Sequence, residues 1–496
     1  MLYTVTTTLP PVHGGRTNSL LNRIKMIDNY LNIPTKIITT NYNANYPDVY
    51  NLFLEQNKVT HNIQFENIYD WLSDFNLYTK PKSKFLKKEK IVETPYKING
   101  FKHKVSKNNT VVRYYDEDNY VLYRRYYENT YVVQFEDFMS PVSKKRIERW
   151  SYNIYGILHK KTYYSAIANK KTSEDFLDFD GNIYCKKFFN EDDTNSLLQI
   201  QIYKNNRPYK TFISELDLFQ FYYEQIFSDN DTVFCDARLL DKPLLKSKVN
   251  TNNILVFHTS HLNNDTLKPS FKYSLQNHEN VSQFIVLTNK QKSDIQNIES
   301  IPDKKFSVIP HFIQTSQKDE IIDKLDRFLF IGRIAPEKQI DHIIKAYKIY
   351  LEKGYKNKLD IIGRDEKGEQ KRLQNIIKDL NLQNHVNIYD YTNNPLNEFK
   401  KSKASFLTSE FEGFGLTIME SIEMGCPVIS YDIRYGPSEI ISHGENGYLI
   451  EPNNIEMLAE YMMYISDEPL SNVKTKKELT LESAIKNYKK LLMLFK

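Results

Sequence analysis

Two glutamates eight residues apart, Glu412 and Glu420, carry the clearest chemical signal of the chain. Between them lie Gly413 and Gly415, after which the pattern predicts a helix that begins near Leu416. Glycine lets the backbone approach a ligand closely, and a helix start offers unpaired N–H groups to an anion or a sugar. Because Glu420 would lie one turn into the helix, we expect both carboxylates to face one cavity as acceptors for hydroxyl groups. This arrangement is typical of a nucleotide-sugar site.

Two cationic side chains, Arg333 and Lys338, follow a predicted strand at residues 327–331. We expect both to emerge at the carboxyl edge of a parallel sheet and to point into a cleft between domains. A guanidinium and an ammonium at this spacing can neutralise a diphosphate without a metal ion. The alternative interpretation is a solvated loop with two ordinary surface cations.

The first part of the chain offers further candidates for the same cleft. Gly14 and Gly15 follow the first predicted strand and would allow close approach of a ligand, although the full GxGxxG pattern is absent and a plain tight turn is the alternative. His258 and His261 lie at the end of a predicted strand at residues 254–258. A neutral imidazole can bind a sugar hydroxyl, whereas a structural role is the alternative for each histidine.

These residues must be positioned by strands and helices whose signals alternate along much of the chain. The opening predicts a strand at residues 2–8, a helix at 16–31 and a strand at 35–40. From about 70 to 213 the pattern changes to β-rich segments separated by turn residues, which predicts an antiparallel meander. Its clearest segments are residues 110–115, 120–125 and 130–135.

Helix and strand signals alternate again after residue 214, and short apolar strands followed by helices belong in parallel sheets. The sequence therefore predicts an α/β protein with two facing Rossmann-like domains, the N-terminal one interrupted by an antiparallel β-rich insertion. The predicted boundaries are 1–70 with 214–312 for the N-terminal domain, 71–213 for the insertion, 313–480 for the C-terminal domain and 481–496 for a C-terminal helix.

The size and composition restrict the class of protein. A chain of 496 residues is too long for one ordinary core. The three cysteines have no CxxC spacing, so neither a disulfide framework nor a zinc site is expected. No N-terminal targeting signal and no run of eighteen apolar residues occurs, so we expect a cytoplasmic protein.

The positive charge is small overall, with a formal net charge of +5, and does not by itself imply binding to nucleic acid. It gathers between residues 80 and 107, where ten Lys stand against two Glu. Lys84, Lys87 and Lys88 are the candidates for binding a polyanion or an acidic membrane surface. A solvated lysine-rich face or linker is the alternative.

The chain resembles the retaining glycosyltransferases of family 4, which have the GT-B fold. The matching pieces are Gly332-Arg333 with Lys338, the pair Glu412 and Glu420, Gly425-Cys426-Pro427-Val428-Ile429 and Gly447-Tyr448-Leu449-Ile450. The turn at Gly14-Gly15, the Tyr-rich insertion and the run Tyr435-Gly436-Pro437-Ser438 are similar to a narrower branch, the bacterial poly(polyol-phosphate) α-glycosyltransferases that decorate wall teichoic acid. Relatives with a similar insertion modify Ser-rich adhesins.

The resemblance implies a role for each matching residue. Arg333 and Lys338 would hold the UDP diphosphate, Glu412 would contact the donor sugar, and Glu420 would contact the ribose. The family's first-domain histidine falls on His258 or His261, and we prefer His261. The expected catalytic residues are Arg333, Lys338, Glu412 and His261, and the expected donor contacts are Gly14, Gly15, His258, Phe414, Gly415, Leu416 and Glu420. The resemblance also implies catalysis without a metal ion or other cofactor and a homotrimer formed through the insertion.

The function expected from this resemblance is transfer of α-glucose from UDP-glucose to glycerol-phosphate repeats of wall teichoic acid, with retention and in the cytoplasm at the inner face of the membrane. Transfer of α-GlcNAc from UDP-GlcNAc to poly(ribitol phosphate) is one alternative. O-glycosylation of Ser and Thr in repeat-rich surface proteins is another. A catalytically silent subunit that binds an acceptor or a partner enzyme is the alternative outside the enzymes.

Overall fold

The computed structural model describes residues 1–12, 14–73, 91–263, 265–313 and 323–495 of the chain. Lys84, Lys87 and Lys88 lie outside the described residues, so their role in acceptor binding stays a prediction. By the density of internal contacts the chain divides into two compact units. Unit 1 comprises Met1–Thr17 and Ile33–Asn252, and unit 2 comprises Asn18–Asn32 and Asn253–Lys496.

Unit 1 contains four parallel strands built around the first strand of the chain. Strand β1 (Leu2–Thr6) pairs with β14 (Thr232–Cys235) on one side and with β2 (Thr35–Thr39) on the other, and β2 pairs with β3 (Gln64–Asn67). Every residue of β1 is buried. The predicted strand at residues 2–8 ends earlier than expected, shortly before two consecutive prolines that cannot donate to a ladder.

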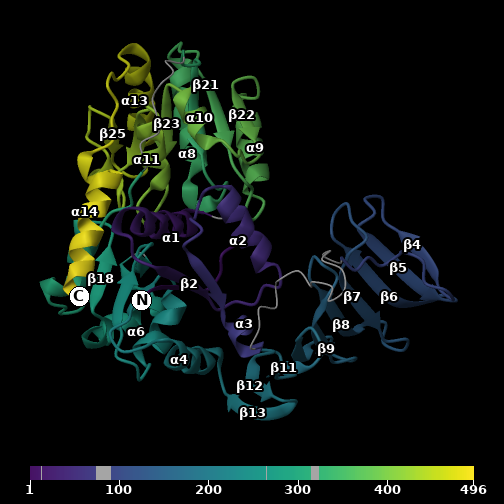
Figure 1. Cartoon of the computed structure of the whole chain (residues 1–496). Helices are drawn as coiled ribbons and strands as arrows, with labels where there is room; N and C mark the ends of the chain where they lie inside the picture. Colours follow the sequence, from purple (N-terminus) through teal and green to yellow (C-terminus); the bar gives the residue numbers. More distant parts are fainter. Residues whose placement is uncertain (13, 74–90, 264, 314–322, 496) are drawn as a thin grey trace. The chain divides into compact units, whose positions relative to one another are not determined.

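The same unit contains the predicted insertion, a ten-stranded antiparallel sheet in which each strand pairs with the next along the chain. Figure 1 shows these strands in blue and blue-green. The strands are β4 (Lys102–Val105), β5 (Val111–Asp116), β6 (Asn119–Tyr126), β7 (Val133–Met139), β8 (Arg146–Tyr152), β9 (Leu158–Tyr164), β10 (Lys171–Leu177), β11 (Ile183–Phe189), β12 (Leu197–Lys204) and β13 (Arg207–Phe212).

One predicted strand of the insertion is displaced. The sequence predicts a strand at residues 130–135, but β7 begins at Val133. The residues before it form a turn in which the Thr130 N–H donates to the Tyr127 carbonyl at 3.2 Å and Asn129 adopts a positive φ of 57°. Asparagine tolerates this conformation, and the β-branched threonine that suggested a strand closes the turn instead.

Unit 2 contains two sets of parallel strands. In the first, β15 (Asn252–Val256), β18 (Gln283–Val286) and β19 (Phe306–Val308) pair in that order. The second is a six-stranded sheet of order β22-β21-β20-β23-β24-β25. Its strands are β20 (Arg327–Ile331), β21 (Lys358–Ile362), β22 (Val386–Tyr389), β23 (Ala404–Leu407), β24 (Val428–Tyr431) and β25 (Gly447–Ile450).

The α-helices of the described residues complete both units. They are α1 (Gly15–Met26), α2 (Tyr46–Glu55), α3 (Ile68–Ser73), α4 (Glu215–Ile226), α5 (Asp241–Leu245), α6 (Pro269–Gln276), α7 (Asn289–Gln296), α8 (Ile340–Glu352), α9 (Glu369–Asp379), α10 (Pro395–Lys400), α11 (Leu416–Glu423), α12 (Pro437–Ile440), α13 (Ile455–Asp467) and α14 (Leu481–Leu492). The predicted helix at 16–31 is α-helical only as far as Met26, after which Ile27–Leu31 form a π-helical segment.

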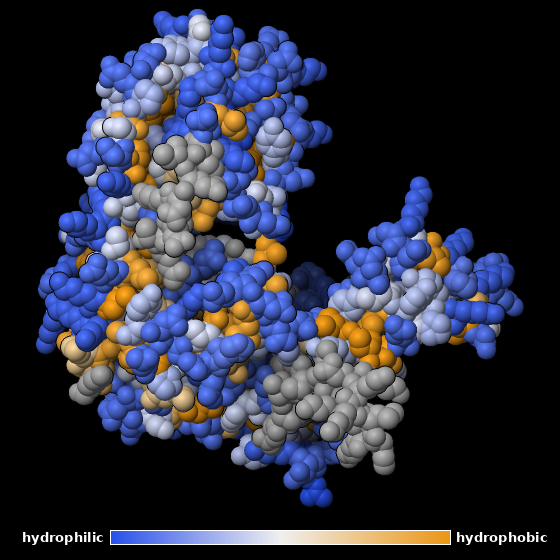
Figure 2. Space-filling view, turned by 45° about the horizontal axis from the view of Figure 1, so that its top comes forward, coloured by the Kyte–Doolittle hydropathy of each residue, from blue (hydrophilic) through white to orange (hydrophobic). Residues whose placement is uncertain are grey.

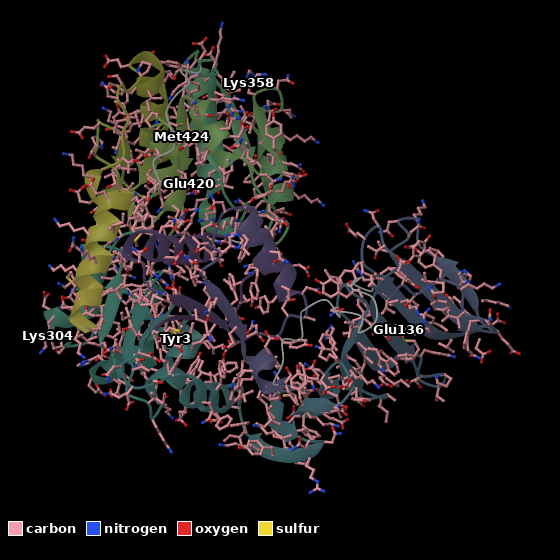
Figure 3. All side chains as sticks on the ribbon, viewed as in Figure 1. Tyr3, Glu136, Lys304, Lys358, Glu420 and Met424 are labelled. Carbon is pink, nitrogen blue, oxygen red and sulfur yellow. The ribbon has the colours of Figure 1, made fainter. Side chains whose placement is uncertain are left out.

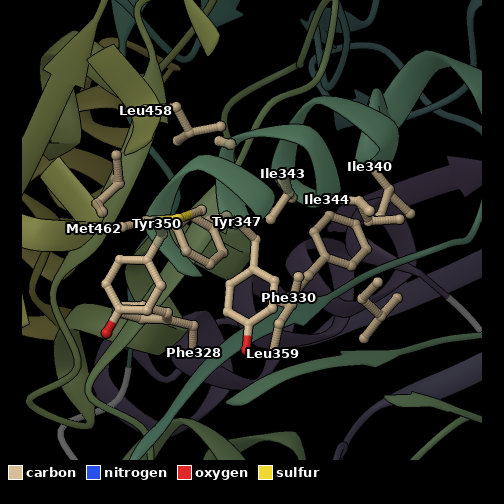
Figure 4. Packing of buried hydrophobic residues seen from close by; sticks show 14 of the residues in the cluster. Phe328, Phe330, Ile340, Ile343, Ile344, Tyr347, Tyr350, Leu359, Leu458 and Met462 are labelled. Atoms are coloured by element: carbon tan, nitrogen blue, oxygen red, sulfur yellow. The ribbon is translucent and has the colours of Figure 1, made fainter. Parts of the chain in front are cut away.

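The core of the six-stranded sheet explains why its strands and helices form where they do. Helix α8 places Ile340, Ile343, Ile344 and Tyr347 at helical spacing on one buried face, and they pack in one cluster with Phe328 of β20 (Figure 4). The Tyr347 hydroxyl donates to the Asn357 carbonyl at 2.6 Å, so this buried polar group is satisfied. This core fixes the ends of the strands from which the site loops emerge.

Figure 2 shows a face that is mostly hydrophilic, with hydrophobic side chains in small separate groups. Within the described ranges, no helix has the length and apolar character needed to cross a bilayer. The sheets described above confirm the predicted combination of parallel α/β sheets and an antiparallel insertion.

Candidate active site

Lys338 and Glu412 meet at the carboxyl edge of the six-stranded sheet of unit 2. Lys338 follows β20 and Glu412 follows β23, and these two strands are parallel neighbours, so their following loops emerge side by side. The Lys338 Nζ lies 2.5 Å from Glu412 Oε1. The Ser409 hydroxyl donates to the same carboxylate oxygen at 2.9 Å, and the Thr408 hydroxyl donates to the Lys338 carbonyl at 2.8 Å. The pair is thus held by side-chain and backbone contacts.

Arg333 lies on the same loop as Lys338 but binds other carboxylates. Its guanidinium donates to Glu366 at 2.6 Å and forms an ion pair with Glu337 at 3.0 Å. About half of its side chain is exposed, so both contacts are accessible to solvent and exchangeable. The structure therefore places both predicted cations after β20, one at the Glu412 carboxylate and the other at the rim of the loop.

The glycines between the two predicted glutamates are required by packing. A Cβ on Gly413 would lie 2.1 Å from the His258 carbonyl oxygen, which no side chain tolerates. Gly415 has a φ of +94° and precedes α11, which begins at Leu416 as the sequence predicts. Phe414 between them is buried. The glycines thus bring the Glu412 loop directly against the backbone at His258.

Glu420 lines a cavity of about 380 Å³ that is formed entirely within unit 2. Burial raises the pKa of Glu420 to about 7. Figure 3 shows Glu420 on α11, well separated from Lys358 at the opposite, amino-terminal end of the sheet. The lining residues are Asn18, Ser19, Asn22, Arg23, Pro310, His311, Phe312, Ile313, Asn393, Asn394, Pro395, Leu396, Leu416, Met419, Glu420 and Tyr488.

The chemistry of this cavity suits a polar ring system with hydroxyl groups. Amides, two hydroxyls, an imidazole, a guanidinium and a carboxylate line it together with apolar side chains, and a mixture of apolar and polar groups is usual for a small-molecule site. Glu412 is not among its lining residues, so the expectation that both glutamates face one cavity is not met. The reason is the turn at Gly413 to Gly415, which directs Glu412 along the loop toward Lys338 while Glu420 lies on the helix.

His261 is fully buried, and its ring stacks on Tyr435 with centroids 6.0 Å apart and planes inclined by 10°. The Tyr435 hydroxyl donates to Asp294 at 2.8 Å. Burial lowers the pKa of His261 to about 4, so the ring is neutral at pH 7. Among the residues that the structure describes, neither ring nitrogen of His261 has a hydrogen-bond partner. Such a side chain is suited to binding a ligand hydroxyl.

His258 lies against the cavity wall through another aromatic contact. Its ring stacks on His311 with centroids 5.5 Å apart, and His311 contacts the edge of Phe414 at the same centroid distance. His311 itself lines the cavity at Glu420. His258 is therefore linked to the cavity through His311, whereas His261 is linked to the loop that carries Tyr435.

Gly14 and Gly15 belong to unit 1, and their predicted contact with the donor stays a prediction. Gly15 is the first residue of α1, and a Cβ on Gly14 would meet no atom of the described residues within 4 Å. Packing therefore does not require glycine at position 14.

Several residues of the site have no clear signal in the sequence. Ser409 lies three residues before Glu412, and the contact between them depends on the fold of the loop. Asp294 and Tyr435 are far apart in the chain, so their hydrogen bond could not be read from spacing. The same holds for the amides of Asn393 and Asn394 that line the cavity.

Comparison with known proteins identifies this region. Residues 312–483 match the family model of the glycosyl transferases group 1, a range that contains Arg333, Lys338, Glu412 and Glu420. The chain is 27% identical over 485 residues to the poly(glycerol-phosphate) α-glucosyltransferase of Bacillus subtilis, with 95% of this chain and 71% of the relative covered. It is also 27% identical over 465 residues to the poly(ribitol-phosphate) α-N-acetylglucosaminyltransferase of Staphylococcus aureus, with 91% and 90% covered.

Two solved structures are similar over the whole chain. A mutant of S. aureus TarM in complex with fondaparinux, α-GlcNAc-glycerol and UDP superposes with a TM-score of 0.81 at 24% identity, covering 100% of this chain and 99% of that one. The pneumococcal O-GlcNAc transferase GtfA in complex with UDP and GlcNAc gives a TM-score of 0.74 at 19% identity, covering 100% and 98%. Residues 312–483 are thus a glycosyl transferases group 1 domain, and the chain is a glycosyltransferase with the GT-B fold.

Proposed function

We propose that this enzyme transfers α-glucose from UDP-glucose to glycerol-phosphate repeats of wall teichoic acid. The observation that carries the proposal is the Lys338–Glu412 pair at the carboxyl edge of the group 1 domain, in the same unit as the cavity at Glu420. The choice of donor and acceptor rests on the similarity to the B. subtilis poly(glycerol-phosphate) α-glucosyltransferase over 95% of the chain.

In this proposal, different side chains bind the uridine, the diphosphate and the sugar of the donor. The uridine occupies the cavity, where the carboxylate of Glu420 accepts hydrogen bonds from ribose hydroxyls. Lys338 and Arg333 neutralise the diphosphate, so the proposed reaction requires no metal ion. When the diphosphate binds, Lys338 turns from Glu412 toward phosphate, and the Glu412 carboxylate becomes available to hydroxyls of the sugar.

The reaction breaks the bond between the anomeric carbon and the β-phosphate oxygen and forms a bond to a glycerol hydroxyl oxygen. The acceptor attacks the face from which UDP departs, and the departing phosphate oxygen takes the proton of the attacking hydroxyl. Negative charge grows on the UDP oxygens in the transition state, so fixed cations there lower the barrier more than they stabilise the substrate. Neutral His261 contributes a hydrogen bond to a hydroxyl of the donor sugar.

Transfer of α-GlcNAc from UDP-GlcNAc to poly(ribitol phosphate) is the second candidate. It is favoured by the S. aureus relative, of which the chain covers 90% at the same identity. Glycosylation of Ser and Thr in repeat-rich proteins is the third, since the GtfA subunit of Streptococcus parasanguinis, a UDP-N-acetylglucosamine–peptide N-acetylglucosaminyltransferase, is 27% identical over 451 residues. The proposal further includes a cytoplasmic enzyme at the inner membrane face that forms a homotrimer through the antiparallel sheet.

A matrix of donors and acceptors tests this proposal. The purified chain is incubated with UDP-glucose or UDP-GlcNAc and with poly(glycerol phosphate), poly(ribitol phosphate) or a Ser-rich peptide, and UDP release is measured. We expect acceptor-dependent release that is greatest with UDP-glucose and poly(glycerol phosphate). Greater release with UDP-GlcNAc and poly(ribitol phosphate) supports the second candidate. Absence of release in every combination contradicts the proposal.

A further inference from the structure

A second cavity lies in unit 2, away from the proposed donor site. It has a volume of about 1000 Å³ and is lined by the turn before β25, by β25 itself, by α13 and by the segment after α13. The turn before β25 lies at the amino end of the parallel sheet, whereas Lys338 and Glu412 follow the carboxyl ends of their strands. Figure 1 shows α13 and β25 side by side. This cavity is therefore a separate feature of the domain.

The floor of this cavity is a group of four rings held in fixed orientations. Tyr448 and Tyr461 stack with centroids 4.4 Å apart, His443 stands at 85° to Tyr448, and Tyr464 stands at 87° to Tyr448. His443 accepts a hydrogen bond from the Leu449 N–H at 3.2 Å through Nδ1, and its Nε2 lies 3.2 Å from the Tyr461 hydroxyl oxygen. Tyr464 remains 45% exposed. Tyr448 is buried, so the accessible aromatic surface of the cavity comes from His443, Tyr461 and Tyr464, and the last two rings are inclined by 78°.

The acidic side chains that line the cavity lie beside these rings. Glu445, Glu460 and Glu468 line the cavity, and among the described residues no Lys or Arg lines it. Within the described part of the chain none of the three carboxylates forms an ion pair, and Glu468 accepts a hydrogen bond from the Tyr464 hydroxyl at 3.0 Å. Lys476 is near Glu445, but its Nζ donates to the carbonyls of Glu439 and Ile441 at 2.9 and 3.2 Å. Three negative charges gather here on a chain whose formal net charge is +5.

We infer that this cavity binds an organic cation of the alkylammonium class. Aromatic faces attract an ammonium group that lies within about 6 Å of a ring centroid, and nearby carboxylates compensate its charge. The volume of about 1000 Å³ accommodates a cation with an extended chain. A phosphate polymer is excluded because three carboxylates repel it. The cavity therefore gives the enzyme a second ligand whose charge is opposite to that of its acceptor.

Binding of spermidine and tetramethylammonium to the purified full-length chain tests the inference. Isothermal titration calorimetry at constant ionic strength measures affinity, with glucose and potassium chloride as comparison ligands. We expect saturable binding of spermidine, weaker binding of tetramethylammonium and none of glucose. The double variant Glu460→Gln/Glu468→Gln should weaken spermidine binding by about tenfold or more, because two charges are removed without a change of shape. Binding of glucose in preference to both cations would overturn the inference.

Matched variants separate a local site from a general effect of charge. Glu456→Gln removes a charge from the same helix at a position that does not line the cavity, and it should leave binding unchanged within about twofold. Tyr464→Leu should weaken tetramethylammonium binding, whereas Tyr464→Phe keeps the ring and should retain it. Turnover of the donor should stay at the wild-type level in all four variants. If Glu456→Gln loses as much cation affinity as the double variant, the assignment is contradicted. It is also contradicted if the double variant binds cations as tightly as wild type does.

Discussion

The Nζ of Lys338 lies 2.5 Å from Oε1 of Glu412, although the two residues are 74 positions apart in the chain. Both side chains are mostly buried, so the ion pair is shielded from solvent more than a surface pair is. The proposed reaction exchanges this internal partner of Lys338 for the diphosphate of the donor. The ion pair therefore holds the Lys338 side chain in place before the donor binds.

Substitution of Lys338 by Met should separate catalysis from stability. We expect turnover to fall by about 100-fold or more, because the charge that stabilises the leaving group is lost. The free energy of unfolding should fall by only about 1–2 kcal/mol, since Ser409 still donates to Glu412. Turnover is measured by UDP release, and stability by urea unfolding. Lys345→Met, which removes an exposed lysine paired with Asp341, serves as control and should keep full activity. Wild-type turnover in Lys338→Met contradicts the proposed role.

Glu420 should make stability depend on pH in a defined window. Because burial raises its pKa from 4.5 to about 7, the folded chain binds this proton more tightly than the unfolded chain. The contribution of Glu420 to the free energy of unfolding is therefore largest below pH 4.5 and falls as pH rises toward 7, by at most about 3 kcal/mol. The free energy of unfolding of Glu420→Gln, relative to that of wild type, should increase when the pH is raised from 5 to 8. Thermal unfolding at both pH values measures this difference, and an identical pH response of the two proteins counts against it.

The same substitution should weaken nucleotide binding. A glutamine retains one acceptor oxygen but loses the charge that accepts from ribose hydroxyls, so we expect UDP affinity to fall by about tenfold at pH 8. Calorimetric titration with UDP measures the effect. Glu456→Gln is the matched control and should bind UDP as wild type does. An unchanged affinity in Glu420→Gln would place the ribose elsewhere.

His261→Phe should lower activity without a loss of stability. The substitution preserves a ring that can stack on Tyr435 and removes two buried nitrogens that have no partner among the described residues. We expect a thermal midpoint equal to or above that of wild type, with turnover reduced by about tenfold or more and UDP affinity unchanged. Because burial lowers the pKa of His261 to about 4, its titration should produce no inflection of the wild-type rate near pH 6.5. Full turnover of the variant excludes His261 from the donor site.

Two glycine substitutions should differ in their effect on stability. Gly413→Ala brings a Cβ to 2.1 Å from the His258 carbonyl oxygen, so the loop must move and stability should fall by about 2 kcal/mol or more. The Cβ of Gly14→Ala meets no atom of the described part of the chain within 4 Å, so this variant should leave stability within about 1 kcal/mol of wild type. Its turnover should nevertheless fall if the diphosphate approaches this turn. Urea unfolding and UDP release measure both variants, and tolerance of Gly413→Ala would show that the loop lies elsewhere.

The strands of the group 1 domain could be predicted closely because buried parallel strands are continuous apolar runs. The predicted strand at residues 327–331 coincides with β20. Local packing decided the cases in which prediction failed. The segment at 130–135 contains β-branched residues, yet its first residues close a turn before β7. The helix after Gly15 was predicted in one piece, although its last turn is π-helical.

The individual site residues could be predicted, but their partners could not. Spacing locates Lys338 and Glu412 after strands, and the neighbouring positions of β20 and β23 in the sheet bring them together. The same spacing suggested one cavity for Glu412 and Glu420, whereas the turn at Gly413 separates their surroundings. The stack of His261 on Tyr435 depends on the packing of two loops from distant parts of the chain. Such contacts are set by tertiary structure, and no local pattern encodes them.

The linkage formed in the product distinguishes α-glucosylation of glycerol phosphate from other reactions of the enzyme. The purified enzyme is incubated with UDP-glucose and poly(glycerol phosphate), and the isolated polymer is analysed by proton and phosphorus NMR, with Lys338→Met as the matched control. We expect α-anomeric glucose attached to glycerol hydroxyls, formed in amounts equal to the UDP released, and almost none with the variant. A β-linked product, or an unmodified polymer in the presence of active enzyme and donor, would contradict the proposed reaction.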